Sequence, residues 1–349
     1  MKSAVQNNVL VPIYRQLVQH YKQAILKQDY RPGSRIDSIH EIMQRHQVSR
    51  ETAKLVLKSL AAEGLIIQKP GKGSFIADLG PRRKIWAVIA PFFSSQTEQL
   101  VHHLRQQLAP LDRRLEIYID YNNWQEEIRL VGTLINERYE AVLLIPTFDE
   151  SRTASFYKRL QTGKTYLTLL NHTMSGSSFT YVIQSYDLGV RRAVQYLMDK
   201  HGGAIVYIKN NIWLGRNMVQ EVMQETLKTS LRREPASRPF FIIDDINSLD
   251  RDFIDRHRVN GLFCCEDIDA IRMIGRLKEW GYSLPGDVAL VSYGNTDLAR
   301  FFTPAITSID PHMREMAVLS TNIIMDSMRG KNVDLQQYVL HPELVVRET

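Results

Sequence analysis

The chain has 349 residues, 44% of them hydrophobic and 23% charged, with a formal net charge of +6. This composition is that of a soluble globular protein, and the length exceeds one ordinary hydrophobic core, so we expect two or three domains. The only two cysteines, Cys264 and Cys265, exclude a disulfide framework, and the lack of a long apolar run or a signal peptide predicts a cytoplasmic protein without membrane contact.

The excess positive charge is confined to the start of the chain. Residues 1–80 hold 12 Lys/Arg and 6 Asp/Glu, whereas the remaining residues hold 32 of each kind. A basic segment joined to a neutral one is typical of a nucleic-acid-binding domain attached to a second domain.

The first segment reads as three helices followed by a hairpin. Apolar residues recur at helical spacing in 12–28, the run RPGSRI breaks that helix, and DSIHEIMQRH follows with Asp37 or Ser38 as N-cap. A third helix begins after Ser49, a good N-cap, and stops near Gly64. The order of these elements predicts a winged helix-turn-helix.

The stretch QKPGKGSFI at 68–76 is the hairpin. Its glycines and lysines lack the spacing of a phosphate-binding loop, and strand-forming residues flank it on both sides. Gly71 and Gly73 allow a tight turn and a close approach to a sugar-phosphate chain, and Lys72 sits at the tip. The third helix exposes hydroxyl and cationic groups suited to phosphates and base edges.

Residues Val11 to Asp78 resemble the DNA-binding domain of the gluconate-repressor (GntR) family. The motifs PIYRQL, RPGSRI, VSRETAK, LAAEGLI and PGKGSFIA stand in the family's order and spacing. Family members usually have Arg in the second helix, where this chain has His40, the candidate DNA contact of that helix. The resemblance implies DNA contacts from the third helix and the wing by Ser49, Arg50, Thr52, Lys54, Gly71 and Lys72.

After the linker ADLGPRRK, strand-like and helix-like runs alternate up to DVALVSYG. This alternation predicts parallel sheets with helices on both faces, and ligands bind such sheets beyond the carboxyl ends of the strands. Those ends carry aromatic and amide groups but no nucleophile–base pair and no plausible metal helix. We therefore expect ligand binding without catalysis, metal or cofactor.

The second part, from about Lys84 onward, resembles the effector domain of the lactose- and galactose-repressor (LacI/GalR) family. The similarity is most specific from NGLFCCEDIDAIRM to SYGNTDLARFFTPAITSID and in YVLHPELVVRET. It implies two lobes, crossovers near Ile183, Ile309 and Asn332, a ligand in the cleft and a homodimer. The family's sugar-binding Asp falls on Gly294. The candidate ligand residues are Phe92, Phe93, Ser94, His172, Trp213, Arg216, Glu266, Asp267, Tyr293 and Asn295.

We therefore expect an α/β protein in which a winged helix-turn-helix is linked to a two-lobe, type I periplasmic-binding-protein-like domain with parallel sheets. The expected bounds are 1–78 for the first domain, 79–84 for the linker and 85–349 for the second, with lobe 1 at about 85–183 and 310–332 and lobe 2 at about 184–309 and 333–349.

The combination predicts a transcription repressor that binds double-stranded operator DNA as a homodimer under the control of a small effector, with a monosaccharide as the leading hypothesis. A similar pairing of domains is found in arabinose-responsive repressors. Two alternatives remain: a DNA-binding protein whose second domain only dimerises, and a DNA-tethered enzyme acting on a small sugar.

Overall fold

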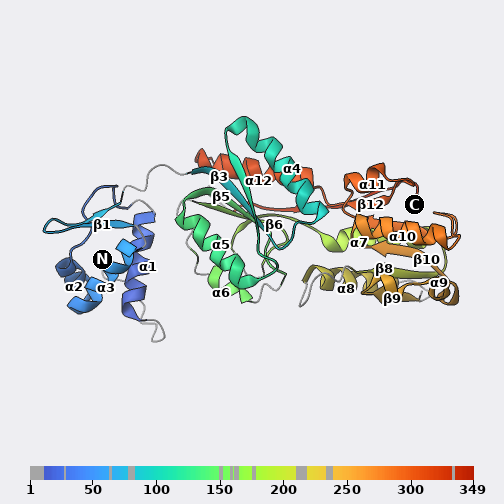
Figure 1. The fold of residues 1–349 in the computed structure, drawn as a ribbon, viewed down its shortest axis with the longest axis horizontal. Helices are drawn as coiled ribbons and strands as arrows, with labels where there is room; N and C mark the ends of the chain where they lie inside the picture. The colour runs from blue at the N-terminus through green and yellow to red at the C-terminus, as the bar shows by residue number, and fades with distance from the viewer. Residues whose placement is uncertain are drawn as a thin grey trace. The chain divides into compact units, whose positions relative to one another are not determined.

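The computed structural model divides into two compact units, which are described separately below. Unit 1 holds the chain up to Arg83, and unit 2 holds nearly all of the remainder (Figure 1). Within the described residues, no helix is long and apolar enough to cross a membrane. The described ranges are 12–26, 29–62, 65–77, 83–148, 152–157, 160, 165–174, 178–209, 218–232, 239–331 and 335–349.

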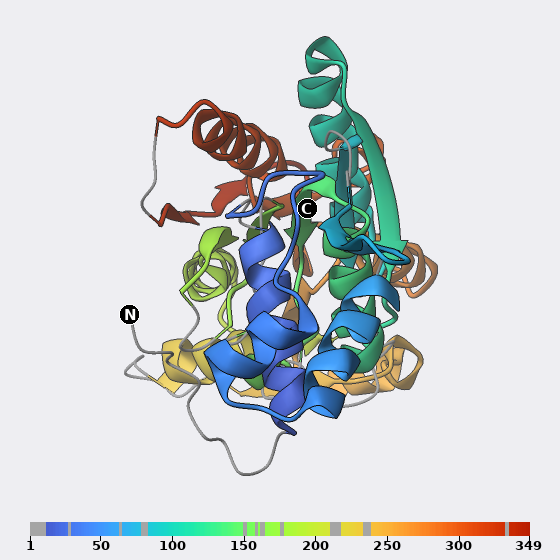
Figure 2. The same ribbon diagram turned by 90° about the vertical axis from the view of Figure 1, so that its left-hand side faces the viewer.

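Unit 1 consists of three helices and a two-stranded hairpin (Figure 2, blue). Helices α1 and α2 both pack against α3, and the side chains of Leu17, Tyr21, Ile42, Val56 and Leu60 meet in its core without solvent exposure. The elements are α1 (Ile13–Leu26), α2 (Ile39–His46), α3 (Arg50–Ala62), β1 (Ile66–Lys69) and β2 (Gly73–Ile76).

The run RPGSRI, expected from the sequence to break the first helix, also extends the hairpin. Arg35 forms an antiparallel bridge with Phe75, and the backbone N–H of Ile36 donates to Ser74 O at 3.1 Å. The backbone N–H of Ile76 donates in turn to Ser34 O at 2.8 Å. The wing is therefore tied to the segment between α1 and α2 by main-chain hydrogen bonds, which holds it against the helices.

Lobe 1 of unit 2 is built on a six-stranded sheet in the order β13-β7-β6-β5-β3-β4. The strands β13, β7, β6 and β5 run parallel, as do β3 and β4. The elements are β3 (Arg83–Ala90), α4 (Ser95–Leu108), β4 (Arg114–Ile119), α5 (Trp124–Asn136), β5 (Tyr139–Leu144), α6 (Ala154–Tyr157), β6 (Tyr166–Asn171), β7 (Thr180–Gln184), α12 (Met313–Met328) and β13 (Gln337–Leu340).

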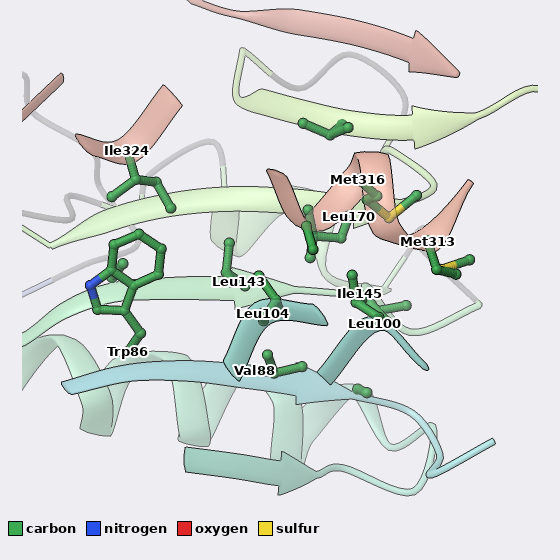
Figure 3. Close-up of a cluster of buried hydrophobic side chains, with 14 of the residues drawn as sticks. Trp86, Val88, Leu100, Leu104, Leu143, Ile145, Leu170, Met313, Met316 and Ile324 are labelled. Atoms are coloured by element: carbon green, nitrogen blue, oxygen red, sulfur yellow. The ribbon is translucent and has the colours of Figure 1, made fainter. Parts of the chain in front are cut away.

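Both faces of the lobe 1 sheet are covered, as the near-continuous apolar run of β3 requires. Helices α4 and α12 lie on one side of the sheet and α5 on the other (Figure 1). Trp86 and Val88 pack with α4 and α12, whereas Ala87 and Ile89, which alternate with them, pack with α5. Figure 3 shows the first of these clusters, in which Met316 of α12 lies near Leu170 of β6.

Lobe 2 has a six-stranded sheet in the order β14-β12-β11-β10-β8-β9, with β14 antiparallel to β12 and the other strands parallel. Helices α7 and α8 cover one face, and α9, α10 and α11 cover the other. The elements are α7 (Tyr186–Lys200), β8 (Ala204–Ile208), α8 (Met218–Arg232), β9 (Phe240–Ile243), α9 (Arg251–His257), β10 (Val259–Cys264), α10 (Asp267–Glu279), β11 (Ala289–Tyr293), α11 (Asp297–Phe301), β12 (Thr307–Asp310) and β14 (Glu343–Val345).

The α/β architecture with parallel sheets predicted from the sequence is confirmed. The chain passes between the two sheets after Gln184, after Asp310 and after Leu340. The third passage is later than the expected position near Asn332, a residue outside the described ranges. The reason is that β13 pairs in parallel with β7, so residues 337–340 still complete the lobe 1 sheet before the chain crosses.

Candidate DNA-contacting surface and interlobe cavity

The start of α3 presents a cationic surface with a capped helix end. The backbone N–H of Thr52 donates to Ser49 Oγ at 3.2 Å, which is the N-cap bond expected from the sequence. The Thr52 hydroxyl lies 3.0 Å from the same Ser49 oxygen. Arg50 and Lys54 are exposed, whereas Ala53 is buried in the core. These neighbouring residues thus separate into a solvent-facing basic side and a packed side.

The tip of the wing is a turn that requires glycine. The backbone N–H of Lys72 donates to Lys69 O at 3.0 Å across Pro70 and Gly71. Gly71 has φ +71°, and proline followed by a residue of positive φ is the pattern of a type II turn. The exposed Lys72 projects from this turn, and Lys69 Nζ lies 5.1 Å from the centre of the Phe75 ring.

Two residues beside these surfaces have roles that the sequence left open. Ser38, not Asp37, caps α2, and the Ser38 backbone N–H donates to Glu41 at 2.6 Å in a capping box. Asp37 instead accepts the hydroxyl of Tyr21 at 2.6 Å and pairs with Arg45.

His40 lies exposed on α2, as a DNA contact would require. Arg35, in the segment between α1 and α2, places a further cation beside the wing: a Cβ placed on Gly73 would lie 3.1 Å from Arg35 Nε. Its signal in the sequence is the RPGSRI motif.

A cavity of about 100 Å³ lies between the lobes of unit 2. This is several times the roughly 10–15 Å³ that one water molecule needs. It opens at the carboxyl ends of β3, β5, β6, β10 and β11, where ligands of parallel sheets are expected. Its described lining residues are Pro91, Phe92, Ser94, Gln96, Thr97, Leu100, Ile145, Phe148, Asn171, Tyr186, Val219, Gln220, Met223, Cys265, Glu266, Tyr293 and Met313.

Aromatic rings form one wall of the cavity. The ring centres of Phe92 and Phe148 are 6.1 Å apart, and Phe148 stacks on His172 at 5.5 Å. His172 is 4% exposed and lies behind Phe148 instead of lining the cavity. Burial lowers the pKa of His172 to about 4, so its ring is neutral near pH 7. The face of an aromatic ring suits the apolar face of a small sugar ring.

The floor of the cavity contains a hydrogen-bond chain that joins the lobes. The hydroxyl of Tyr293, from lobe 2, donates to Gln184 Oε1 of lobe 1 at 2.5 Å. Gln184 Nε2 donates to Asn171 Oδ1, and the side chains of Asn171 and Tyr186 both line the cavity. Of these residues the sequence reasoning selected only Tyr293 as a ligand residue. Gln184 ends a buried strand and Tyr186 follows it closely, but their spacing carries no recognisable motif.

The adjacent carboxylates Glu266 and Asp267 occupy different environments. Glu266 lines the cavity, whereas Asp267 is 2% exposed and absent from the lining. Asp267 accepts hydrogen bonds from the Ser292 and Ser308 hydroxyls and from both the backbone N–H and the hydroxyl of Thr296. Asp267 therefore anchors α10 to the ends of β11 and β12.

Four more of the selected ligand residues lie elsewhere or outside the described ranges. Asn295, with φ +46°, donates to Asp310 Oδ2 at 2.9 Å and accepts from Arg347 at 2.5 Å, away from the cavity. Phe93 is 54% exposed and does not line the cavity. Trp213 and Arg216 fall within 210–217, which the described ranges omit. The cavity brings together four of the ligand residues expected from the sequence: Phe92, Ser94, Glu266 and Tyr293.

Comparison with known proteins assigns both parts of the chain. Residues 13–76 match the bacterial regulatory proteins of the gntR family, and residues 186–349 match the periplasmic binding protein-like domain. The chain joins a gntR-family domain to a periplasmic binding protein-like domain. Both resemblances noted in the sequence are thereby confirmed. This combination is that of a ligand-responsive DNA-binding repressor.

Individual relatives extend over one or both parts. The chain is 22% identical to the arabinose metabolism transcriptional repressor of Halalkalibacterium halodurans, over 96% of each protein. The fold matches a periplasmic binding protein/LacI transcriptional regulator from Alkaliphilus metalliredigens complexed with D-xylulofuranose, with a TM-score of 0.63, 17% identity and coverage of 76% of this chain and 98% of that one. It also matches a dimeric Lac repressor with a TM-score of 0.66, 14% identity and coverage of 76% and 98%.

Proposed function

We propose that this gntR-family protein is a repressor whose binding to operator DNA is controlled by a neutral monosaccharide in the interlobe cavity. The observation that carries the proposal is that one chain holds both an exposed cationic helix and wing and a cavity between two lobes. A ligand that fits one lobe arrangement better than another shifts the population of arrangements, and this shift alters the DNA affinity.

The chemistry of the lining supports an uncharged polar ligand. Among the described lining residues, Glu266 carries the only formal charge, and hydroxyl and amide groups accompany the rings of Phe92 and Phe148. A carboxylate and several amides can bind sugar hydroxyls, while an aromatic face covers the apolar side of the ring. A phosphorylated ligand would meet the charge of Glu266 and is disfavoured.

We propose ligand binding without catalysis. The relatives are transcription regulators. The hydroxyl of Ser94 on the cavity wall is the N-cap of α4, where it accepts the Thr97 N–H at 3.3 Å. We propose that the protein works as a homodimer in the cytoplasm, where operator DNA lies. The relative that is a dimeric Lac repressor supports the first point.

Two measurements on the full chain test the proposal. Thermal unfolding against a panel of neutral sugars, beginning with L-arabinose because of the relative's name, should give a concentration-dependent rise in Tm for one sugar. Fluorescence anisotropy with DNA from upstream of the protein's own gene should then show a changed operator affinity in that sugar. Binding of DNA without any sugar response would favour a domain that only dimerises, and turnover of the sugar would favour an enzyme.

A further inference from the structure

The wing has a solvent-facing side to which three segments of the chain contribute. Arg35 is paired with Phe75 of β2, and Phe75 is paired in turn with Ile67 of β1. Residues that lie directly opposite one another on antiparallel strands project from the same face, as do residues two positions apart on one strand. Lys69 and Gly73, which are paired with each other, therefore share that face. These five residues form what we call the outer face of the wing.

The outer face is exposed and basic. Arg35, Ile67 and Lys69 are exposed, whereas Ile66 and Ile76, which project from the opposite face, are buried in the core of unit 1. None of the five residues of the outer face is acidic. Within the described part of the chain, no acid forms an ion pair with Arg35. The outer face thus adds two cations to the lysine at the tip of the wing.

The side chain of Arg35 extends along this face toward the tip. A Cβ built on Gly73 would lie 3.1 Å from Arg35 Nε, 3.4 Å from Nη2 and 3.5 Å from Cζ. The guanidinium group therefore lies against the bare backbone of Gly73, two positions nearer the tip than Phe75, the residue with which Arg35 is paired. Gly73 directly follows Lys72, so the guanidinium is held close to the exposed turn of the wing.

The backbone fixes the position of both cations. Arg35 lies between the two main-chain hydrogen bonds that tie residues 34–36 to β2. Lys69 is part of β1, and its Nζ lies 5.1 Å from the centre of the Phe75 ring, as in a cation–π contact. A cation whose main chain is already ordered loses less conformational freedom when it binds a partner. The outer face is therefore preorganised for an anionic ligand that runs along the wing.

We propose that Arg35 binds a phosphate group of DNA, so that the sugar-phosphate chain is contacted by the outer face of the wing as well as by the turn at Gly71 and Lys72. The inference rests on the proposed function, in which DNA is the partner of unit 1. A guanidinium group presents a planar fork of N–H donors that matches two phosphate oxygens at once. Because such a contact is made to the backbone and not to the bases, it contributes affinity without sequence preference.

Arg35 could also serve the fold alone, by covering Gly73 or by its attraction to Glu41 of α2. The salt dependence of DNA binding separates the two roles. A phosphate contact releases counterions from the DNA, whereas a contact within the protein releases none. A structural role would therefore appear as a lower Tm with an unchanged salt slope, and a phosphate contact as a smaller slope with an unchanged Tm.

The test uses the full chain and a fluorescent duplex from upstream of the protein's own gene, in anisotropy titrations at several KCl concentrations. Arg35→Ala should weaken binding by roughly ten- to a hundredfold, the loss of a charge-assisted hydrogen bond. It should also reduce the slope of log affinity against log salt by about one unit, with little change in Tm. Arg35→Lys keeps the charge and should recover most of the slope. Arg256→Ala, which removes an exposed arginine from α9 of unit 2, is the matched control and should bind as wild type does.

Neutral methylphosphonate groups, placed singly in the duplex, then locate the contact. For at least one position, the substitution should weaken binding of the wild type but not of Arg35→Ala, because both changes remove the same interaction. A wild-type slope in Arg35→Ala, no recovery in Arg35→Lys, or equal effects of every methylphosphonate on both proteins would overturn the inference while leaving the proposed function intact. Failure of the wild-type chain to bind this DNA would overturn the proposed function and this inference together.

Discussion

The backbone N–H of Lys72 donates to the carbonyl oxygen of Lys69 at 3.0 Å, and this bond closes the tip of the wing. Gly71 lies inside the closed turn at φ +71°, and a Cβ added there would meet no atom within 4 Å. Any cost of a larger residue at Gly71 is therefore a cost of backbone conformation and not of crowding.

From this turn we predict that Gly71→Val weakens DNA binding more than Lys72→Ala does. A β-branched residue at positive φ costs about 1–2 kcal/mol, which corresponds to roughly five- to thirtyfold in affinity if the turn must be preserved on DNA. Gly71→Asn is the control, because asparagine tolerates this conformation, and it should bind nearly as wild type does. Anisotropy titrations decide the order, and a larger loss in Lys72→Ala would show that charge outweighs backbone shape at the tip.

Exposed cations on α3 give a second prediction. Arg50→Ala and Lys54→Ala should weaken operator binding with little change in Tm, since both side chains project away from the core. Each lost phosphate contact should reduce the slope of log affinity against log salt by about one unit. Lys58→Ala, exposed farther along the same helix, is the matched control. If all three variants and wild type have equal salt slopes, α3 is not part of the DNA-binding surface.

The sequence was sufficient for the features that depend on local chemistry. The Ser49 cap, the positive φ of Gly71 and the strand-helix alternation follow from residue type and spacing, and the structure has each of them. The third crossover depended on whether β13 pairs with β7 or leaves lobe 1. The outcome depends on strand pairing between residues more than 150 positions apart. The polar run before β13 is typical of a connection between two lobes.

The candidate ligand site was predictable only in part, because neighbouring side chains separate in space. Phe92 lines the cavity and Phe93 is exposed, although the sequence offers no means of choosing between them. Tyr293 lines the cavity. Asn295, two residues later, has a left-handed backbone conformation, and its side chain is hydrogen-bonded to Asp310 and Arg347 instead. Gln184 carries no local motif, because its two side-chain hydrogen-bond partners, Tyr293 and Asn171, are brought to it only by the fold.

Two buried carboxyl groups of lobe 1 lead to a pH prediction. Asp120 is fully buried, and burial, followed by the nearby charge of Glu127, raises the pKa of Asp120 to about 8. The unfolded chain releases this proton near pH 4, whereas the folded chain keeps it up to about pH 8. The folded state therefore binds more protons between these values, and the contribution of Asp120 to stability falls as the pH rises through this window, by at most about 1.4 kcal/mol per pH unit.

Asp120→Asn should remove that dependence. The amide retains an oxygen to accept the Asn122 N–H, which donates to Asp120 Oδ1 at 2.8 Å, and it carries no proton that titrates in this range. Urea unfolding of both proteins from pH 5 to 9 is the measurement, and the difference in the free energy of unfolding should shift in favour of the variant as the pH rises. A constant difference across this range would mean that Asp120 is already ionised in the folded protein at pH 5.

The neighbouring carboxylates of α10 give the last prediction, which separates ligand binding from stability. Asp267 is buried and accepts hydrogen bonds from Ser292, Thr296 and Ser308, whereas Glu266 borders the cavity. In Asp267→Asn one oxygen becomes an NH₂ group that faces existing donors, so we expect a loss of about 1.5–3 kcal/mol in the free energy of unfolding. The folded fraction should still bind the effector, because the cavity lining is unchanged.

Glu266→Gln should show the opposite pattern. It removes a charge-assisted acceptor from the cavity at nearly constant shape, so the sugar that raises the Tm of the wild type should bind roughly ten- to a hundredfold more weakly, with little change in the stability of the ligand-free protein. Chemical unfolding and calorimetry on both variants give the two quantities independently. If Asp267→Asn loses sugar affinity while Glu266→Gln keeps it, the effector contacts α10 through Asp267, and the cavity described here is not where it binds.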